Sequence, residues 1–285
     1  MMRDVSPVKG NHGVHITLFL LTLLTTTAAG ALQRGNNPLS DPLSLVSGLP
    51  FSLTLMTILG VHEMGHYLTS HRHRVPATLP YFIPAPSIIG TFGALIRMKG
   101  VIWDRRTLLD IGVSGPLAGF LVALPALAIG FLFSEVLPAT GEETVGFVLG
   151  DSLIVALTGK LILGNLPHDA TVVLHPVAFA GWIGLFVTSL NLLPVGQLDG
   201  GHIAKAMFPV RFDLVARIIH LSLIAMGIIF WEGWLVWALV LIFIGVGHPP
   251  VLMDHIELDP GRRKLGFIAL AIFVLTFVPA PFRLV

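Results

Sequence analysis

Apolar segments close to the length of a bilayer span recur along this chain and constrain its fold more than any other feature. A membrane-spanning helix needs about 20 mostly apolar residues. Of the 285 residues 54% are apolar and only 12% are charged, a balance that exceeds what a soluble core of this size could bury. The sequence therefore predicts an all-α polytopic membrane protein with about seven transmembrane helices, at roughly 15–33, 45–70, 109–134, 176–194, 214–231, 233–247 and 265–280.

Two other apolar stretches are too short, and too rich in Gly or Pro, to cross a bilayer. They lie at about 82–98 and 151–163, and we expect re-entrant or interfacial elements there, the first a small re-entrant loop or β-hairpin. No soluble domain or long linker interrupts the sequence. We therefore expect a single transmembrane domain over residues 1–285, with a core at about 45–210 and accessory helices at 15–33 and 214–280.

The distribution of Lys and Arg predicts the orientation, because these residues accumulate in cytoplasmic loops. A cytoplasmic N-terminus leaves only three of the seventeen basic residues outside, namely Arg34, Lys160 and Arg283. The sequence thus predicts an N-in, C-out chain in the lipid bilayer, and its net charge of +1 argues against a nucleic-acid partner. The other fourteen basic residues are Arg3, Lys9, Arg72, Arg74, Arg97, Lys99, Arg105, Arg106, Lys205, Arg211, Arg217, Arg262, Arg263 and Lys264.

The first apolar segment has two interpretations. Arg3 and Lys9 precede it and "AGA" occurs at 29–31, a pattern that also fits a cleavable signal peptide. We favour a retained span, because the apolar stretch continues through "TTTAAGAL" at a length that could cross the bilayer. Either interpretation leaves the remaining topology unchanged.

The motif "HEMGH" lies inside the second predicted span. His62 and His66 are four residues apart, so on a helix they project from one face and can bind one tetrahedral metal ion. Glu63 points to a neighbouring face, where it can act as a general base without being a ligand. Ionisable groups in a span cost on the order of 2.5–3.5 kcal/mol each on insertion scales. The motif therefore predicts a zinc site.

A catalytic zinc ion usually has three protein ligands and one open position. With no cysteine in the chain, the best candidate for the third ligand is Asp199, in "SLNLLPVGQLDGGHIAK". Asp199 stands six residues before Lys205, and His66 stands six residues before Arg72. If these segments are helical, each lies about 9 Å along the helix axis from a basic residue. This spacing predicts a shared depth. The alternative is that Asp199 only caps the helix that Gly200 enters.

The paired motifs "HEMGH" and "NLLPVGQLDGG" resemble the site-2 protease family of intramembrane zinc metalloproteases, over roughly residues 50–205. The resemblance implies an intramembrane zinc metalloendopeptidase that hydrolyses peptide bonds within or near transmembrane segments, with a single-pass membrane protein as its substrate. It also implies one zinc ion per chain. The site residues that it implies are the ligands His62, His66 and Asp199, the general base Glu63, and Asn191, which would orient substrate or stabilise the oxyanion.

Two further stretches agree with this family. "PAPSIIGTFGALIRM" resembles its Gly-rich, membrane-inserted hairpin or loop, which presents an edge to an extended substrate, and Gly90, Phe92 and Gly93 match as substrate-binding residues. "SGPLAGF" resembles the start of the third core helix of the family. There, Gly115 and Gly119 would let two helices approach closely.

The chain departs from the family where many members carry a second Pro, because it has Gly196 at that position. This form is similar to a branch found in prokaryotes and plastids, and we expect a looser turn ahead of Asp199. We expect neither a PDZ module, because 135–175 offers only about forty residues, nor a CBS module. The resemblance and the charge distribution imply a multi-pass protein of a prokaryotic plasma membrane, with its site toward the cytoplasm.

Two other functions remain open. One is a membrane zinc transporter or chaperone-like protein without protease activity, in which Glu63 could be replaced by Gln. The other is a different membrane peptidase with the HExxH motif, in which a Glu usually serves as third ligand. His202 is either a partner of the site or an ordinary interfacial histidine, and His248 adjoins a proline and is expected to be structural. The sequence does not determine the substrate, its trigger or the oligomeric state.

Overall fold

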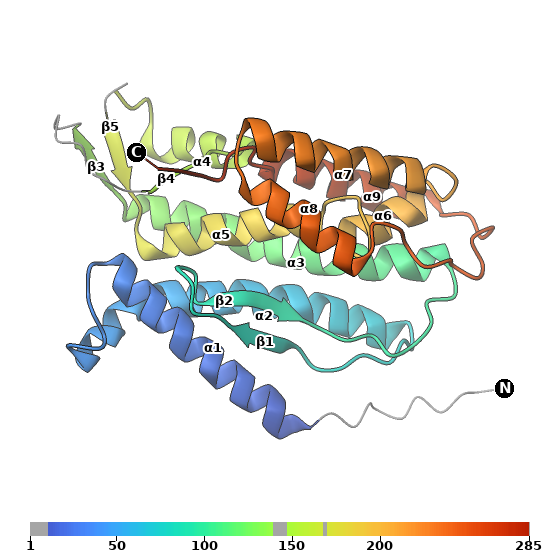
Figure 1. The fold of residues 1–285 in the computed structure, drawn as a ribbon, viewed down its shortest axis with the longest axis horizontal. Helices are drawn as coiled ribbons and strands as arrows, with labels where there is room; N and C mark the ends of the chain where they lie inside the picture. Colours follow the sequence, from blue (N-terminus) through green and yellow to red (C-terminus); the bar gives the residue numbers. More distant parts are fainter. Residues whose placement is uncertain (1–10, 139–146, 168–169, 285) are drawn as a thin grey trace. The chain divides into compact units, whose positions relative to one another are not determined.

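The computed structural model describes residues 11–138, 147–167 and 170–284. Arg3 and Lys9, which contribute to the predicted orientation, lie outside these ranges. In sequence order, the described elements are α1 (His12–Gln33), the 3-10 helix η1 (Pro42–Gly48), α2 (Leu49–Arg72), β1 (Tyr81–Pro84), β2 (Thr91–Leu95), α3 (Arg105–Leu132), β3 (Glu135–Pro138), β4 (Phe147–Leu149), α4 (Leu153–Leu163), β5 (Ala170–Val173), α5 (Pro176–Asn191), α6 (Asp199–Met207), α7 (Phe212–Ile229), α8 (Gly233–Ile244), α9 (Pro260–Thr276) and β6 (Phe282–Leu284) (Figure 1).

The lengths of the helices support a polytopic membrane protein. Among the described residues, four helical segments are long and apolar enough to cross a bilayer: α1, Pro42–Arg72, α3 and α7. Helices α4, α5 and α8 are apolar but shorter. Because α5, α8 and α9 have only 16, 12 and 17 residues, the count of seven spans stays a prediction.

The described residues divide into two compact units, the first of which contains 11–101, 118–135 and 172–184. In this unit, strands β1 and β2 form an antiparallel hairpin from Tyr81↔Leu95 to Pro84↔Thr91. Figure 1 shows the hairpin beside α1 and α2, both of which it contacts. The hairpin expected at 82–98 is confirmed.

Helix α1 is hydrogen-bonded to the hairpin near its turn. Thr25 donates its hydroxyl proton to the carbonyl oxygen of Gly90 (2.6 Å), and the side-chain amide of Gln33 donates to that of Ile88 (2.7 Å). Gly90 has φ +82°, and a Cβ there would lie 2.5 Å from atoms of Thr25 and Thr26. Only glycine adopts this conformation at no steric cost and leaves room for the helix.

The second unit contains 102–117, the described part of 136–171, and 185–284. Helix α6 packs against α7 and α9, and α7 packs against α8. Arg262 on α9 donates both to Asp110 on α3 (2.9 and 2.6 Å) and to Asp259 (2.6 Å). Strands β4 and β6 pair antiparallel, and β3 pairs with β5. The sequence did not predict these four short strands.

We predict that Gly130→Ala lowers the midpoint of thermal unfolding of the protein in detergent micelles. In the first unit, a Cβ at Gly130 on α3 would overlap the backbone of Ala178 on α5, and overpacking of this kind typically costs about 1–3 kcal/mol. Gly60→Ala on α2 is the matched control, because the nearest atom to its Cβ is 3.7 Å away. Equal midpoints for the two variants would show that the close packing of α3 and α5 contributes little to stability.

Candidate metal centre

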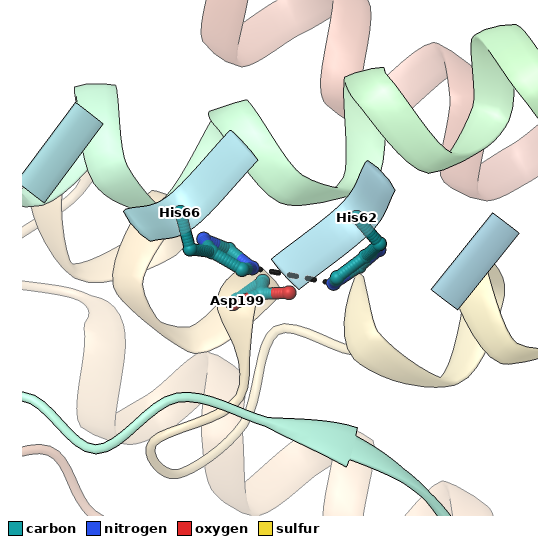
Figure 2. Close-up of side chains that lie close together, drawn as sticks. All are labelled: His62, His66 and Asp199. Atoms are coloured by element: carbon teal, nitrogen blue, oxygen red, sulfur yellow. Dashed lines mark hydrogen bonds between the residues drawn. The ribbon is translucent and has the colours of Figure 1, made fainter. Parts of the chain in front are cut away.

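His62 and His66 lie on successive turns of α2, and both are buried (4% and 6% exposed). Their Nε2 atoms are 3.2 Å apart, as Figure 2 shows for the two rings. Two nitrogen ligands of one tetrahedral zinc ion, each about 2.0–2.1 Å from the metal, would be about 3.3 Å apart. The i, i+4 spacing of the motif therefore already brings two donors to the separation that one ion requires.

Glu63 is also buried (6% exposed), one residue from His62 on the same helix. Three ionisable side chains between positions 62 and 66 are thus withdrawn from water within a segment apolar enough to span a membrane. Burying such groups is costly unless they are paired or bind a metal. The burial of all three makes this part of α2 a candidate functional site.

Gly119 on α3 lies directly against the His62 ring in the first unit. A Cβ at this position would lie 3.0 Å from Nδ1 and 3.2 Å from Cβ of His62. The sequence predicted a close helix contact at this glycine, but not that its neighbour is a candidate ligand. No signal in the sequence pairs the two residues, since they are 57 positions apart.

Asp199 is the first residue of α6, and the N-cap position belongs to Leu198, which makes no side-chain cap hydrogen bond. The alternative, in which Asp199 is the N-cap of a helix that begins at Gly200, is therefore wrong. Helix α5 ends at Asn191, and a turn at 192–198 leads into α6. Asn191 is half-buried at the end of α5.

His62, His66 and Asp199 each offer one ligand atom, and these atoms all lie within 4.8 Å of one another. Figure 2 shows the Asp199 carboxylate next to the two imidazoles. The group could hold a metal ion. Two imidazole nitrogens and one carboxylate oxygen suit zinc, and three protein ligands leave one coordination position open for catalysis.

The predicted substrate-binding residues of the hairpin differ in their surroundings. Phe92 on β2 is 76% exposed, and apart from Gly93 and its two chain neighbours no described residue has an atom within 4 Å of the position that a Cβ of Gly93 would occupy. Gly90, by contrast, is buried against α1. None of the three belongs to the His62, His66 and Asp199 group.

Comparisons of this chain with family models and with curated proteins both point to one family of metalloproteases. Residues 50–231 match Peptidase family M50. The chain is 34% identical over 238 residues to "Probable zinc metalloprotease EGY1, chloroplastic" from Oryza sativa subsp. japonica, which covers 82% of this chain and 41% of that protein. It is 31% identical over 276 residues to "Probable zinc metalloprotease EGY2, chloroplastic" from Arabidopsis thaliana, covering 96% of this chain and 49% of that protein.

The chain therefore spans less than half the length of these two curated relatives. No solved structure matches it. The family match includes both "HEMGH" and "NLLPVGQLDGG" and agrees with the resemblance to the site-2 proteases. Since the match covers well over half of the residues, the chain belongs to Peptidase family M50.

Proposed function

We propose that this protein is an intramembrane zinc metalloendopeptidase that hydrolyses peptide bonds within or near the transmembrane segments of single-pass membrane proteins. The main support for the proposal is that one ligand atom each of His62 and His66 on α2 and of Asp199 on α6 lie within 4.8 Å of one another, while Glu63 is buried on α2 beside His62. Membership of Peptidase family M50 supports the same activity.

In this proposal, His62, His66 and Asp199 hold one zinc ion per chain. When bound, zinc supplies Lewis acidity that polarises the scissile carbonyl and a water molecule. Glu63 takes the proton from the attacking water and then gives it to the departing amide nitrogen. Asn191 offers its side-chain amide as a hydrogen-bond donor to the substrate carbonyl oxygen, on which negative charge develops.

The substrate imposes a further requirement, because a helix hides its peptide bonds in its own hydrogen bonds and must unwind before attack. In the described part of the chain, β2 pairs with β1 alone, so its other edge can receive an extended peptide by β-addition. The exposure of Phe92 and the space beside Gly93 support contacts with substrate. We propose that Gly90 contributes indirectly, because its contacts with α1 hold the turn of the hairpin.

We also propose the finer topology that the sequence predicts: seven spans, a cytoplasmic N-terminus, and one peptidase domain with its core at about 45–210. Helix α1 is proposed to be a retained span, because its hydrogen bonds with Gly90 and Ile88 support the hairpin. A prokaryotic plasma membrane, with the site toward the cytoplasm, completes this proposal. The two relatives named above are plant proteins described as chloroplastic.

A zinc transporter or chaperone-like protein is the second candidate, since the same three ligands could bind zinc without catalysis. We expect Glu63→Gln to separate the two functions. As a general base, Glu63 should contribute on the order of 10²- to 10⁴-fold to cleavage, whereas the variant should keep one zinc ion per chain. The measurement is cleavage of a panel of single-span substrates by purified protein, with zinc content determined by elemental analysis.

Wild-type protein treated with a zinc chelator is the control for that experiment, and it should also lose activity. Cleavage by Glu63→Gln at the wild-type rate would refute the proposed role of Glu63. Zinc bound by a wild-type protein that cleaves none of the substrates would favour the transporter or chaperone-like function.

Asp199→Asn tests the third ligand. We expect zinc content and cleavage to fall together in this variant, because a neutral amide oxygen is a weaker zinc ligand than a carboxylate. The measurement is zinc stoichiometry after dialysis against a weak chelator. Full metal content together with full activity would favour the other type of HExxH peptidase, in which a Glu is the third ligand.

Phe92→Ala tests the hairpin. Since the side chain is 76% exposed, its removal should leave the fold intact, and we expect the KM for a membrane substrate to rise several-fold with little change in kcat. Phe243→Ala on α8 is the matched control, because that side chain is 82% exposed and has no part in the proposal. Equal KM values for both variants would exclude Phe92 from substrate binding.

A further inference from the structure

A short loop after α8 contacts the segment that carries Asp199. We call residues Gly245–Pro249 the α8 loop; it belongs to the same compact unit as α6. The backbone N–H of Gly196 donates to the carbonyl oxygen of Val246 (2.9 Å). Nδ1 of His202 and Nε2 of His248 are 2.7 Å apart and form a second hydrogen bond. The two contacts lie three residues before and three residues after Asp199.

The direction of the histidine hydrogen bond follows from its neighbour. Nδ1 of His248 lies 2.6 Å from the carbonyl oxygen of Pro249, which can only accept, so this nitrogen carries a proton. Burial lowers the pKa of His248, and it outweighs the hydrogen bond to Pro249, which raises the pKa; the positive charge of Lys205 lowers it further, so the neutral ring is favoured. Nε2 of a neutral His248 is then an acceptor, and His202 donates its Nδ1 proton to it.

Gly196 has the backbone conformation that the first contact requires. Its φ is +60°, and a Cβ there would lie 2.5 Å from the carbonyl oxygen of Gly245. A proline fixes φ near about −65° and has no N–H, so it could neither adopt this turn nor donate to Val246. The glycine therefore ties the turn to the α8 loop, and the looser turn expected from the sequence stays a prediction.

The rest of α6 is also closely packed. A Cβ at Gly200 would overlap the carbonyl oxygen of Leu192, and a Cβ at Gly112 on α3 would lie 2.9 Å from Cβ of His202. At the far end of the helix, the Arg105 guanidinium donates to the carbonyl oxygen of Ala206 (2.7 Å). The position of α6 is thus determined by contacts at its start, along its length and at its end.

We propose that the α8 loop positions Asp199 as a metal ligand, with His248 and Gly196 as its two positioning residues. This inference rests on the proposed function, in which Asp199 binds zinc. It assigns to the region after α6, which the sequence suggested to be accessory, a part in building the metal centre. Partners that orient a metal ligand typically change metal affinity about 10- to 100-fold when they are removed.

His248→Ala tests the proposal in the full-length chain. We expect zinc affinity, measured by competition with a chromogenic chelator, to fall by about 10- to 100-fold. We also expect kcat to fall while KM changes little, because the loop contacts the segment that carries the proposed ligand Asp199. His248→Gln should restore most of the affinity, since its side-chain oxygen can accept the proton of His202. His255→Ala, an exposed histidine before α9, is the matched control and should behave as wild type.

Three results would overturn the proposal in different ways. Unchanged zinc affinity in His248→Ala would refute the positioning role and leave the proposed function intact. Equal losses in His248→Ala and His248→Gln would show that the ring acts through packing and not through its hydrogen bond. A wild-type chain without zinc would refute the proposed function itself. If His248→Ala unfolds in detergent, Gly196→Ala provides the same test, because it retains the N–H but strains the turn.

Discussion

Two imidazole nitrogens 3.2 Å apart inside an apolar helix form the contact on which the rest of the structure depends. A hydrogen bond between the two rings would use one lone pair and would not balance the negative charges of Asp199 and Glu63. A divalent cation accepts electron pairs from both rings and from Asp199 at once. The ionised carboxylates of Asp199 and Glu63 would together balance the two positive charges of the zinc ion. A neutral centre costs less to place in a membrane span.

Glycines allow the backbone to approach the proposed ligands closely. Gly119 leaves room for the His62 ring, and Gly196 lets the chain turn into the helix that Asp199 begins. Helices in membranes associate largely through close packing, for which small residues are favoured. In this protein the same packing also orients candidate ligands. The positions of His62 and Asp199 thus depend on residues that carry no reactive group.

The sequence predicted the candidate site better than its surroundings. The i, i+4 spacing of His62 and His66, the choice of Asp199 as third ligand and the Gly-rich hairpin all follow from local patterns, and the structure brings His62, His66 and Asp199 together. The hydrogen bond between His202 and His248 joins residues 46 positions apart, so no periodic pattern in the sequence predicts it. Strands β3 to β6 are three or four residues long, and α5 and α8 are shorter than the apolar stretches that suggested spans.

In the proposed centre, two imidazoles on a helix long enough to span the membrane and a carboxylate at the start of α6 bind one zinc ion. X-ray absorption spectroscopy at the zinc edge, on protein purified without added metal, tests it most directly. We expect one zinc ion per chain, with two imidazole nitrogens and at least one oxygen at about 2.0–2.2 Å. An absence of zinc from active protein, or a coordination shell without imidazole, would contradict it.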